Sequence, residues 1–540
     1  MANVTPAQSL SSEERKVIFA SSLGTVFEWY DFYLYATLTP FFAASFFPPG
    51  SDTAQLLSAL ATYAAGFLVR PFGALVFGRV GDLVGRKYTF LVTISVMGIS
   101  TFGVGLLPTY ATVGLAAPAL LTLLRLLQGL ALGGEYGGAV IYVAEHSDPK
   151  RRGYTTSWIQ TTATVGFFLS LLVIGLCRKS FFTDESFKDW GWRVPFWFSL
   201  VLLGFSLYIR LKLHESPVFL KMKSEARVSK NPLTESFLRY PNVKYVVLAL
   251  FGAVAGQGVV WYTGQFYALF FLTNTLKVDY WTSYLLMGGA LLIATPFFVV
   301  VGRLSDRIGR VKLIALGCLL AAVTYFGVFK QLTHAMNPAL EAFRDSTAIT
   351  VAADDSTCNF HLFTTAKTQY SECDRVRDFF TKRGLSFESK PADPAAPVVV
   401  QIGEVRLEGW KPDKPGTDDA RYTKVLADHK YPSKAEGSNW VLGLILLAYL
   451  VLLVTLVYGP IAALLVELFP AKIRYTSMSL PYHLANGWIG GLVPFVAAAM
   501  AANAGNIYYG LWYPVIVAAI TLVVGLSFLR DAKPDFDINA

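Results

Sequence analysis

About twelve apolar runs, each near 20 residues long, recur along the chain and constrain its fold more than any other feature. A helix needs about 20 apolar residues to cross the hydrocarbon core of a bilayer. The runs are continuously apolar, whereas the strands of a membrane β-barrel alternate between apolar and polar residues. The sequence therefore predicts an all-α membrane protein with twelve transmembrane helices, at about 17–47, 56–80, 88–107, 113–143, 153–177, 191–211, 243–273, 280–301, 312–330, 440–466, 476–501 and 508–529.

Charge is scarce and unevenly placed. Only 15% of the residues are charged, against about a quarter in soluble domains. The net charge of +9 does not indicate nucleic-acid binding, because the basic residues lie in short connections after the even-numbered runs and in the linker 212–242. Lys and Arg gather on the cytoplasmic side of membrane proteins. Both termini are therefore predicted to be cytoplasmic.

A long polar segment, 331–439, interrupts the pattern between the ninth and tenth runs, on the outer side. A structureless loop of this length is improbable. Strand-like stretches at 349–352 and 398–406, with a helix-like stretch at 374–382, predict a small α+β domain. Cys358 and Cys373 fall inside it and can form a disulfide in an oxidising compartment. Two unrelated thiols are the alternative.

A short glycine-rich motif follows the second run and recurs after the eighth. Its glycines would let helix ends approach closely in a tight turn, and its aspartates can cap a neighbouring helix or pair with an arginine. We interpret the two copies as gates that close one face of the protein, although a plain polar turn explains either copy alone. The two copies contain Gly78, Asp82, Gly85 and Arg86, and Gly302, Asp306, Gly309 and Arg310.

The repeat predicts a duplicated architecture of two pseudo-symmetric six-helix bundles. The predicted units are an N-terminal bundle at 1–211, a cytoplasmic linker at 212–242, the first part of the C-terminal bundle at 243–330, an extracytoplasmic insertion at 331–439, and the rest of the C-terminal bundle with the tail at 440–540.

The first and fourth runs contain charged residues. Because a charge inside the bilayer costs several kcal/mol, we expect each of them to pair with another charge or to have a function. Glu28 and Asp31 share one helix face. Two close carboxylates repel, so one of them could hold and release a proton; an interfacial position or permanent pairing is the alternative. Arg125, with Gln128 beside it, can bind the carboxylate of a substrate or of either acid. The coupling hypothesis is competition, in which protonation frees Arg125 for an anionic substrate, and the alternative is a structural ion pair.

The second half offers weaker candidates. Trp261 or Tyr262 could form an aromatic wall for a quaternary ammonium group, with Gln257 on the same span. His483 could serve as a second proton site. Packing and helix-contact roles are the alternatives for these residues. A cytoplasmic-side charge network is predicted from Glu135, Glu467 and Arg474.

The duplicated motif resembles the signature of the major facilitator superfamily. Further segments resemble its metabolite:proton symporter branch, which includes proline/betaine, α-ketoglutarate, citrate and shikimate carriers. They are 24–32 (Gly-Thr-Val-Phe-Glu-Trp-Tyr-Asp-Phe), Arg70-Pro71-Phe72-Gly73, 125–138, 191–196 and 467–475. This resemblance implies a secondary transporter of the alternating-access type, which couples proton entry to uptake of a small organic acid or zwitterion. It also implies a location in a bacterial inner membrane, where we expect the protein to be monomeric.

Two other functions stay open at this point: an uncoupled uniporter or exporter, and a membrane sensor that uses the outer domain. The sequence has no phosphate-binding G-x-x-x-x-G-K-[ST] motif and no Cys/His cluster with metal-ligand spacing. We therefore expect no ATP-driven pump, no metal, no cofactor and no enzyme activity.

Overall fold

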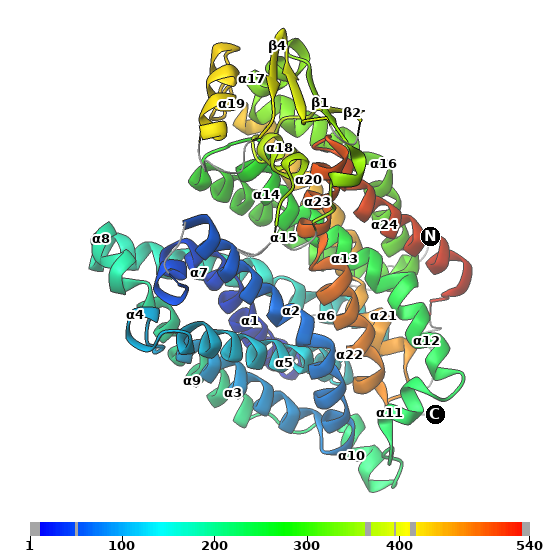
Figure 1. Ribbon diagram of the computed structural model, residues 1–540. Coiled ribbons are helices and arrows are strands. Elements are labelled where there is room, and N and C mark those ends of the chain that lie inside the picture. Colours follow the sequence, from blue (N-terminus) through cyan, green and yellow to red (C-terminus); the bar gives the residue numbers. More distant parts are fainter. Residues whose placement is uncertain (1–10, 49–51, 362–368, 394–395, 411–416, 532–540) are drawn as a thin grey trace.

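The computed structural model describes residues 11–48, 52–361, 369–393, 396–410 and 417–531. Most of this chain is helical (Figure 1). Helices are expected inside a bilayer, because no water is present there to form hydrogen bonds with backbone amides and carbonyls, and a helix satisfies these groups internally. The N-terminal half contains α1 (Ser12–Phe46), α2 (Asp52–Leu83), α3 (Arg86–Val104), α4 (Tyr110–Val113), α5 (Ala116–Glu145), α6 (Arg152–Gln160), α7 (Thr162–Leu176), α8 (Asp184–Ser186) and α9 (Arg193–Leu211).

The C-terminal half follows a linker with two short helices, α10 (Pro217–Ser224) and α11 (Pro232–Phe237). Its first long helix, Asn242–Thr275, is irregular, because two π-helical turns separate α12 (Asn242–Ala249), α13 (Ala255–Tyr262) and α14 (Ala268–Phe270), and a third follows α14. The remaining helices are α15 (Tyr280–Ile308), α16 (Arg310–Met336), α20 (Trp440–Tyr458), α21 (Ile461–Leu468), α22 (Arg474–Leu484), α23 (Val493–Ala504) and α24 (Trp512–Phe528).

Eleven helical segments among the described residues are long and apolar enough to cross a membrane. The sequence predicts twelve spans, and the difference lies in α1. This helix has 35 residues, but it carries Glu28 and Asp31 and many tyrosines and threonines. Its composition therefore falls outside the apolar class that the other eleven segments share.

The two halves form separate groups of helices that meet along a shared interface (Figure 1). Within the N-terminal half α5 packs against α2 and α3, and α1 packs against α7; within the C-terminal half α20 packs against α15 and α16. Between the halves, α2 packs against α22 and α15 packs against α6. These two pairs are related by the internal repeat, since α2 and α15 each end in one copy of the glycine-rich motif.

The segment between α16 and α20 is a small α+β unit at one end of the C-terminal half (Figure 1). Its sheet has the order β2-β1-β3-β4, in which β1 pairs parallel with β2 and antiparallel with β3, and β3 pairs antiparallel with β4. Its elements are α17 (Pro338–Ser346), β1 (Ile349–Ala353), α18 (Glu372–Thr381), β2 (Glu388–Pro391), β3 (Val399–Ile402), β4 (Val405–Glu408) and α19 (Thr417–Asp428).

The predicted α+β character of this segment is confirmed, with corrections in detail. The single strand predicted at 398–406 is two strands, because the chain turns back at Gly403 with a φ of 55°. Strand β2 was not predicted, since all four of its residues are exposed and give no alternating pattern. Helix α16 extends to Met336, beyond the predicted end at 330. Cys358 and Cys373 form a disulfide with a Cα–Cα distance of 5.3 Å.

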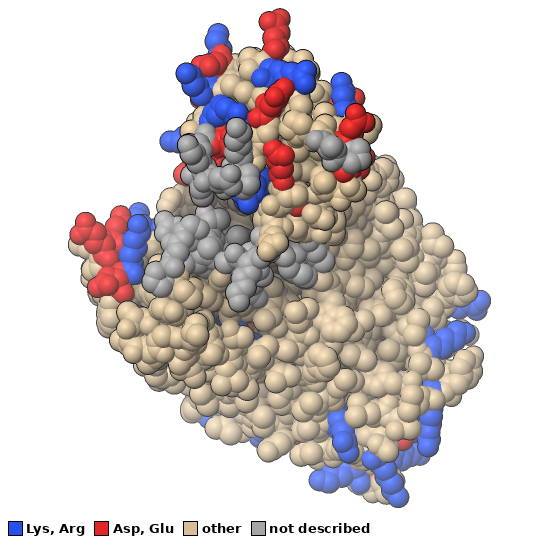
Figure 2. All heavy atoms as spheres, in the orientation of Figure 1, with Lys and Arg blue, Asp and Glu red and all other residues tan. Residues whose placement is uncertain are grey.

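The visible surface has charged residues at its ends and few between them (Figure 2). Acidic and basic side chains mix on the α+β segment, whereas Lys and Arg predominate at the opposite end, near α10 and α11 (Figures 1 and 2). The exposed basic residues of the linker are Lys212, Lys221, Lys223, Arg227, Lys230 and Arg239. The broad uncharged band between the two ends fits a surface in contact with lipid.

Candidate functional site

Asp82, at the end of α2, binds the start of α22 in the other half. Its carboxylate accepts hydrogen bonds from the backbone amides of Tyr475 at 3.2 Å and Thr476 at 2.8 Å. Because α22 begins at Arg474, these amides belong to its first turn, where N–H groups lack helical partners and the helix dipole favours an anion. The carboxylate thus satisfies two donors across the interface between the halves.

Asp306 makes the equivalent contact in the other direction. This residue of α15 accepts hydrogen bonds from the backbone amides of Gly153 at 2.8 Å and Tyr154 at 2.9 Å. Helix α6 begins at Arg152, so these amides again lie in a first helical turn. Two aspartates at equivalent positions of the repeat therefore each cap a helix of the opposite half, and we call the two contacts the aspartate clasps.

The predicted glycines permit this close approach. A Cβ on Gly78 would lie 2.9 Å from the Cα of Thr476, and one on Gly302 would lie 2.4 Å from the Cβ of Ser157. Gly85 and Gly309 have φ values of 138° and 113°, in the region that favours glycine. Each glycine of the repeat therefore has a steric or conformational reason for its place.

The predicted arginines bind beside the clasps. Arg86 donates to Asp82 at 3.0 Å and to the carbonyl of Ala471 at 2.7 Å, so it also crosses the interface. Arg310 donates to Asp306 at 2.7 Å and bonds Glu467 through two nitrogens at 2.8 and 3.1 Å. Its two partners hold it at the start of α16, one turn after the clasp.

The predicted charge network of Glu135, Glu467 and Arg474 does not form a single bonded cluster. Arg474 bonds Glu145 at 2.8 Å across the interface, and both side chains are fully buried. Glu467 bonds Arg310 instead of Arg474. Glu135 lies apart from both, since it pairs with Arg210 at 2.5 Å within the N-terminal half. The sequence also predicts Glu145 to be a gate or interface residue at the cytoplasmic edge, whereas Arg210 was not singled out, although it lies at the charged end of an apolar run.

Asp31, Arg125 and Gln128 form one bonded unit inside the N-terminal half. Arg125 donates to Asp31 at 3.1 Å and to Gln128 at 2.7 Å, and Gln128 donates to Asp31 at 3.1 Å. The Arg125 guanidinium also lies over the ring of Tyr35, 3.5 Å from its centroid. The structure thus brings Arg125 together with Asp31, as the sequence suggested, and Arg125 is bonded to this acid and to Gln128 in the state that the structure shows.

Glu28 differs from Asp31, although the two share a helix face. It is 8% exposed and forms no hydrogen bond or ion pair with any residue that the structure describes. Arg70, on α2, lies within electrostatic range of it. An unpaired charge buried in a membrane protein costs free energy, and Glu28 would avoid this cost by binding a proton, which neutralises its carboxylate.

Aromatic side chains from both halves line the interface next to these acids. The ring of Trp261 lies 5.0 Å from that of Trp29, and the ring of Phe266 lies 4.9 Å from that of Phe32. Nearby, the rings of Tyr136 and Tyr482 stack at 3.8 Å. This group, which we call the aromatic wall, consists of Trp29, Phe32, Phe67, Tyr136, Trp261, Tyr262, Phe266, Tyr458 and Tyr482.

The two remaining predicted residues have different surroundings. Gln257 exchanges two hydrogen bonds with Asn486, at 3.2 and 3.0 Å, inside the C-terminal half. His483 is 1% exposed, and neither of its ring nitrogens has a hydrogen-bond partner among the described residues. Arg70 was missed as a site residue, but as a charge in the second apolar run it could have been found by the argument that singled out Arg125.

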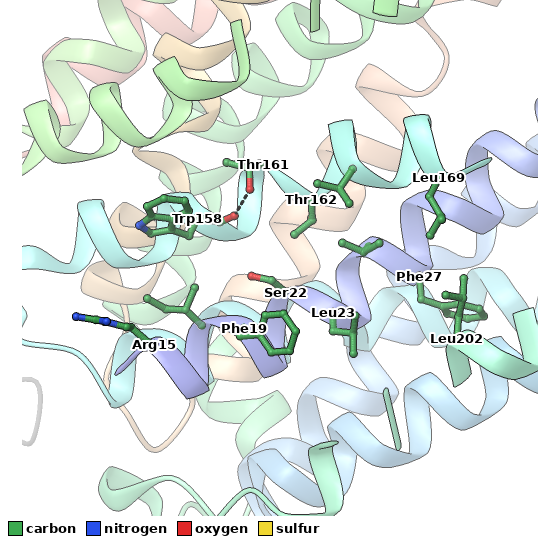
Figure 3. Close-up of a pocket in the computed structure, with 13 residues that line it drawn as sticks. Arg15, Phe19, Ser22, Leu23, Phe27, Trp158, Thr161, Thr162, Leu169 and Leu202 are labelled. Carbon is green, nitrogen blue, oxygen red and sulfur yellow. Dashed lines mark hydrogen bonds between the residues drawn. The ribbon is translucent and has the colours of Figure 1, made fainter. Parts of the chain in front are cut away.

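A small cavity of about 20 Å³ is lined by Asp31, Phe67, Arg70, Arg125 and Gln128, among others. A much larger one, of about 510 Å³, lies between α1, α6, α7 and α9 (Figure 3). Its lining is apolar apart from Arg15 and a few hydroxyls, and Phe19 at its edge is well exposed. The larger cavity thus lies apart from the buried charges, so we place the candidate site at the smaller one.

Two helical halves that clasp each other around buried charges define a class of protein: a multi-pass membrane transporter. Residues 16–239 match the family model described as sugar (and other) transporter. The inner membrane metabolite transport protein YhjE of Escherichia coli is 32% identical over 517 residues, covering 95% of this chain and 93% of the relative. The proline/betaine transporter of Salmonella typhimurium is 36% identical, covering 56% and 62%.

Solved structures show the same fold. The proton:xylose symporter XylE, from E. coli, aligns with a TM-score of 0.65 over 97% of both chains at 15% identity. The human organic anion transporter MFSD10 aligns with a TM-score of 0.51 over 96% of this chain and 99% of that one, at 16% identity. Because the identity with YhjE is 32% over 95% of this chain and the family model also matches, the chain belongs to the major facilitator superfamily, as the motifs predict.

Proposed function

We propose that this protein couples proton entry to uptake of a small organic acid or zwitterionic metabolite across a bacterial inner membrane. Transport would proceed by alternating access, in which the two halves rock about the candidate site. The observation that carries this proposal is Glu28, a buried carboxyl without a bonding partner among the described residues, beside the interface between the halves. A group of this kind can take up a proton on one side and release it on the other.

The orientation and span number form part of the proposal. We infer that α1 is a twelfth span, because its 35 residues exceed the length that a crossing requires and it packs along α7, α5 and α2. The basic linker would face the cytoplasm, together with both termini and the aspartate clasps. The α+β segment would then lie outside the cell membrane, where its disulfide can persist.

Within this mechanism the clasps act as the cytoplasmic gate. Each clasp closes a contact between the halves with charge-assisted bonds to a helix start, and opening that face requires both to break. Asp31, Arg125 and Gln128 stabilise the N-terminal half beside the site, whereas Glu28 carries the proton. The aromatic wall provides apolar surface for the solute, and its rings suit a quaternary ammonium group as well as an aliphatic chain.

Reconstituted vesicles test the proposal. Uptake of organic acids, betaines and amino acids would be measured with and without an imposed pH gradient, for the wild type, Glu28→Gln and a control, Glu185→Gln, which changes an exposed residue. We expect the wild type to accumulate at least one solute only with an inward proton gradient. Glu28→Gln should lose accumulation but retain solute exchange across the membrane, because exchange needs no net proton movement.

Other results would contradict the proposal in distinct ways. A wild-type flux that does not depend on the pH gradient would indicate a uniporter. Accumulation of solute in the outward direction would indicate an exporter. Gradient-driven accumulation by Glu28→Gln at the wild-type level would remove Glu28 as the proton carrier. No flux of any solute above that of protein-free vesicles would favour the sensor hypothesis.

A further inference from the structure

Arg70 is a buried cation without a bonding partner among the residues that the structure describes. It is 8% exposed, it forms no hydrogen bond or ion pair with any of them, and its Nε atom is buried and unsatisfied. Its one direct contact of note is with the ring of Phe67, whose centroid lies 4.5 Å from the guanidinium carbon. Buried polar groups are nearly always bonded, so an exception asks for an explanation.

Other buried arginines in the membrane helices show how unusual this is. Arg152 donates to the carbonyl of Ala144 at 3.4 Å, and each of the other five lies within 3.1 Å of a carboxylate oxygen of the same chain. They are Arg86, Arg125, Arg210, Arg310 and Arg474. Among the described residues, these five cations each have a bonded carboxylate and Arg70 has none, although Arg70 lines the small cavity at the candidate site.

His483, in the other half, lies within electrostatic range of Arg70 and also has no bonding partner among the described residues. Both ring nitrogens are buried and unsatisfied among the described residues. The helix that carries it meets α2 closely, since a Cβ on Gly487, four residues further on, would lie 3.9 Å from the Cβ of Arg70. The charge of Arg70 is close enough to act on His483 and on the hydroxyl of Tyr262.

We propose that Arg70 and His483 together bind the carboxylate of the transported solute, an inference that rests on the proposed transport function. A guanidinium can donate two parallel hydrogen bonds to a carboxylate, and a neutral imidazole can donate a third. One anionic group would therefore satisfy both orphaned side chains. It would also join the two halves, because Arg70 lies on α2 and His483 on α22.

This assignment moves the carboxylate site away from Arg125. That residue already bonds Asp31 and Gln128, so a substrate would have to displace them. Arg70 needs no such exchange. The cavity beside it, at about 20 Å³, is far below the roughly 300 Å³ or more of typical ligand sites. The halves must therefore part at this point to admit a solute, and they close again with the carboxylate between them.

Binding to the purified full-length protein tests the inference. The probes are succinate and glycine betaine, which carry carboxylates, and choline, which has the ammonium group of betaine without the carboxylate. The variants are Arg70→Gln, Arg70→Lys, His483→Gln and the double variant Arg70→Gln/His483→Gln. Controls are Arg377→Gln and His429→Gln, both in the α+β segment. Affinity is measured by tryptophan fluorescence, and folding by thermal unfolding.

We expect Arg70→Gln to weaken binding of a carboxylate probe by about 10-fold or more, and His483→Gln by several fold. Arg70→Lys should fall between wild type and Arg70→Gln, because it keeps the charge but not the paired donors. In the double variant the fold loss of affinity should be smaller than the product of the two single-variant losses, because both residues bind the same carboxylate. Affinity for choline should stay unchanged in all variants.

Three results would overturn the inference. Wild-type affinity for carboxylates in folded Arg70→Gln would do so while leaving the proposed function intact, provided that wild-type vesicles still accumulate the solute. An equal loss of choline and carboxylate binding would assign Arg70 a purely structural role. A wild type that neither binds nor transports any carboxylate probe would end both the inference and the proposed substrate class.

Discussion

Asp82 bonds the backbone amide of Thr476 at 2.8 Å, and it does so from the opposite half of the protein. The contact joins an aspartate at the end of one helix to the unsatisfied start of another. Asp306 repeats the arrangement with Gly153 and Tyr154. Because each clasp is made of charge-assisted bonds to backbone amides, its strength depends on the carboxylate and not on the identity of the capped residues.

Removing the clasp charges should favour opening of the face on which they lie. Asp82→Asn and Asp306→Asn each weaken a contact worth about 1.5–3 kcal/mol. Spin labels at the exposed positions Arg79 and Arg307 would report the distance between the halves. We expect a larger population of long distances in either variant, and the largest in the double variant. The matched control is Asp148→Asn, which changes an exposed aspartate that caps only its own turn; unchanged distances in the clasp variants would contradict the gate.

Adding a methyl group inside the interface should act in the same direction. In Gly302→Ala the new Cβ would lie 2.4 Å from the Cβ of Ser157, a separation that real Cβ atoms do not adopt. Helices α15 and α6 must then move apart. The same pair of spin labels would show this as a shift to longer distances. Gly327→Ala offers the control, because nothing described lies within 4 Å of the added atom; equal behaviour of the two variants would refute the steric argument.

The pairing of Asp31 with Arg125 predicts a specific pattern of stability. Arg125→Gln leaves a buried carboxylate without its cation and should lower the free energy of unfolding by about 3–5 kcal/mol. Adding Asp31→Asn should restore most of that loss, since no unpaired charge remains. Thermal unfolding of the purified protein measures both. Full additivity of the two changes would show that the residues do not act as a pair.

The same residues test the coupling hypothesis drawn from the sequence. If protonation of Asp31 freed Arg125 for an anionic solute, then Arg125→Lys and Asp31→Asn should both lose gradient-driven accumulation. Wild-type accumulation by both variants would remove these residues from the coupling mechanism and leave Glu28 as the proposed proton carrier.

The surroundings of Asp374 predict that the stability of the α+β segment falls at acidic pH. Burial disfavours its charge, but hydrogen bonds from His361, Asn359 and Ser371 outweigh that effect and hold its pKa at about 2, below the ordinary 3.8. A lowered pKa in the folded state adds stability that is complete above about pH 4 and is lost as the pH falls through about 2. We expect Asp374→Asn to destabilise the segment by about 1–2 kcal/mol at neutral pH, after allowance for solvent screening.

Hydrogen exchange of peptides from α18 and β1, corrected for the intrinsic dependence on pH, measures this effect in the whole protein. The protection of the wild type should decline between pH 4 and pH 2, whereas that of Asp374→Asn should be lower at the start and depend less on pH. Asp378→Asn serves as the control, because its carboxylate makes only a surface pair with Lys382. A parallel decline in both variants would show that other groups set the acid response.

Much of the fold could be predicted from the sequence because lipid imposes a simple rule on it. Apolar runs of spanning length mark the helices, and the repeated Gly-Asp-Gly-Arg pattern marks the duplicated halves. The partners of the charges could not be predicted in the same way. Nothing in the spacing of Glu135 and Arg210 shows that they meet. Glu28 and Asp31 look equivalent in the sequence, although of the two only Asp31 has a bonding partner among the described residues. Pairing depends on helix rotation, which a pattern of apolar residues leaves undetermined where both faces are apolar.

The split of 398–406 into two strands has a similar cause. Gly403 breaks the strand by adopting a positive φ, which glycine in an apolar stretch permits but does not require. Strand β2 is held by its neighbour β1 and not by its own composition. Both features depend on contacts with distant residues.

The α+β segment has a mechanical consequence. All of the hydrogen bonds between described residues of 337–439 and the helices outside this segment go to the C-terminal half, such as Phe387 to Gly505 and Asn439 to Ala335. In the proposed mechanism the segment would therefore tilt as one body with that half when the clasps open. A binder or a fluorophore attached to its charged outer surface would act as a pointer, turning a small rotation within the membrane into a large displacement in solution.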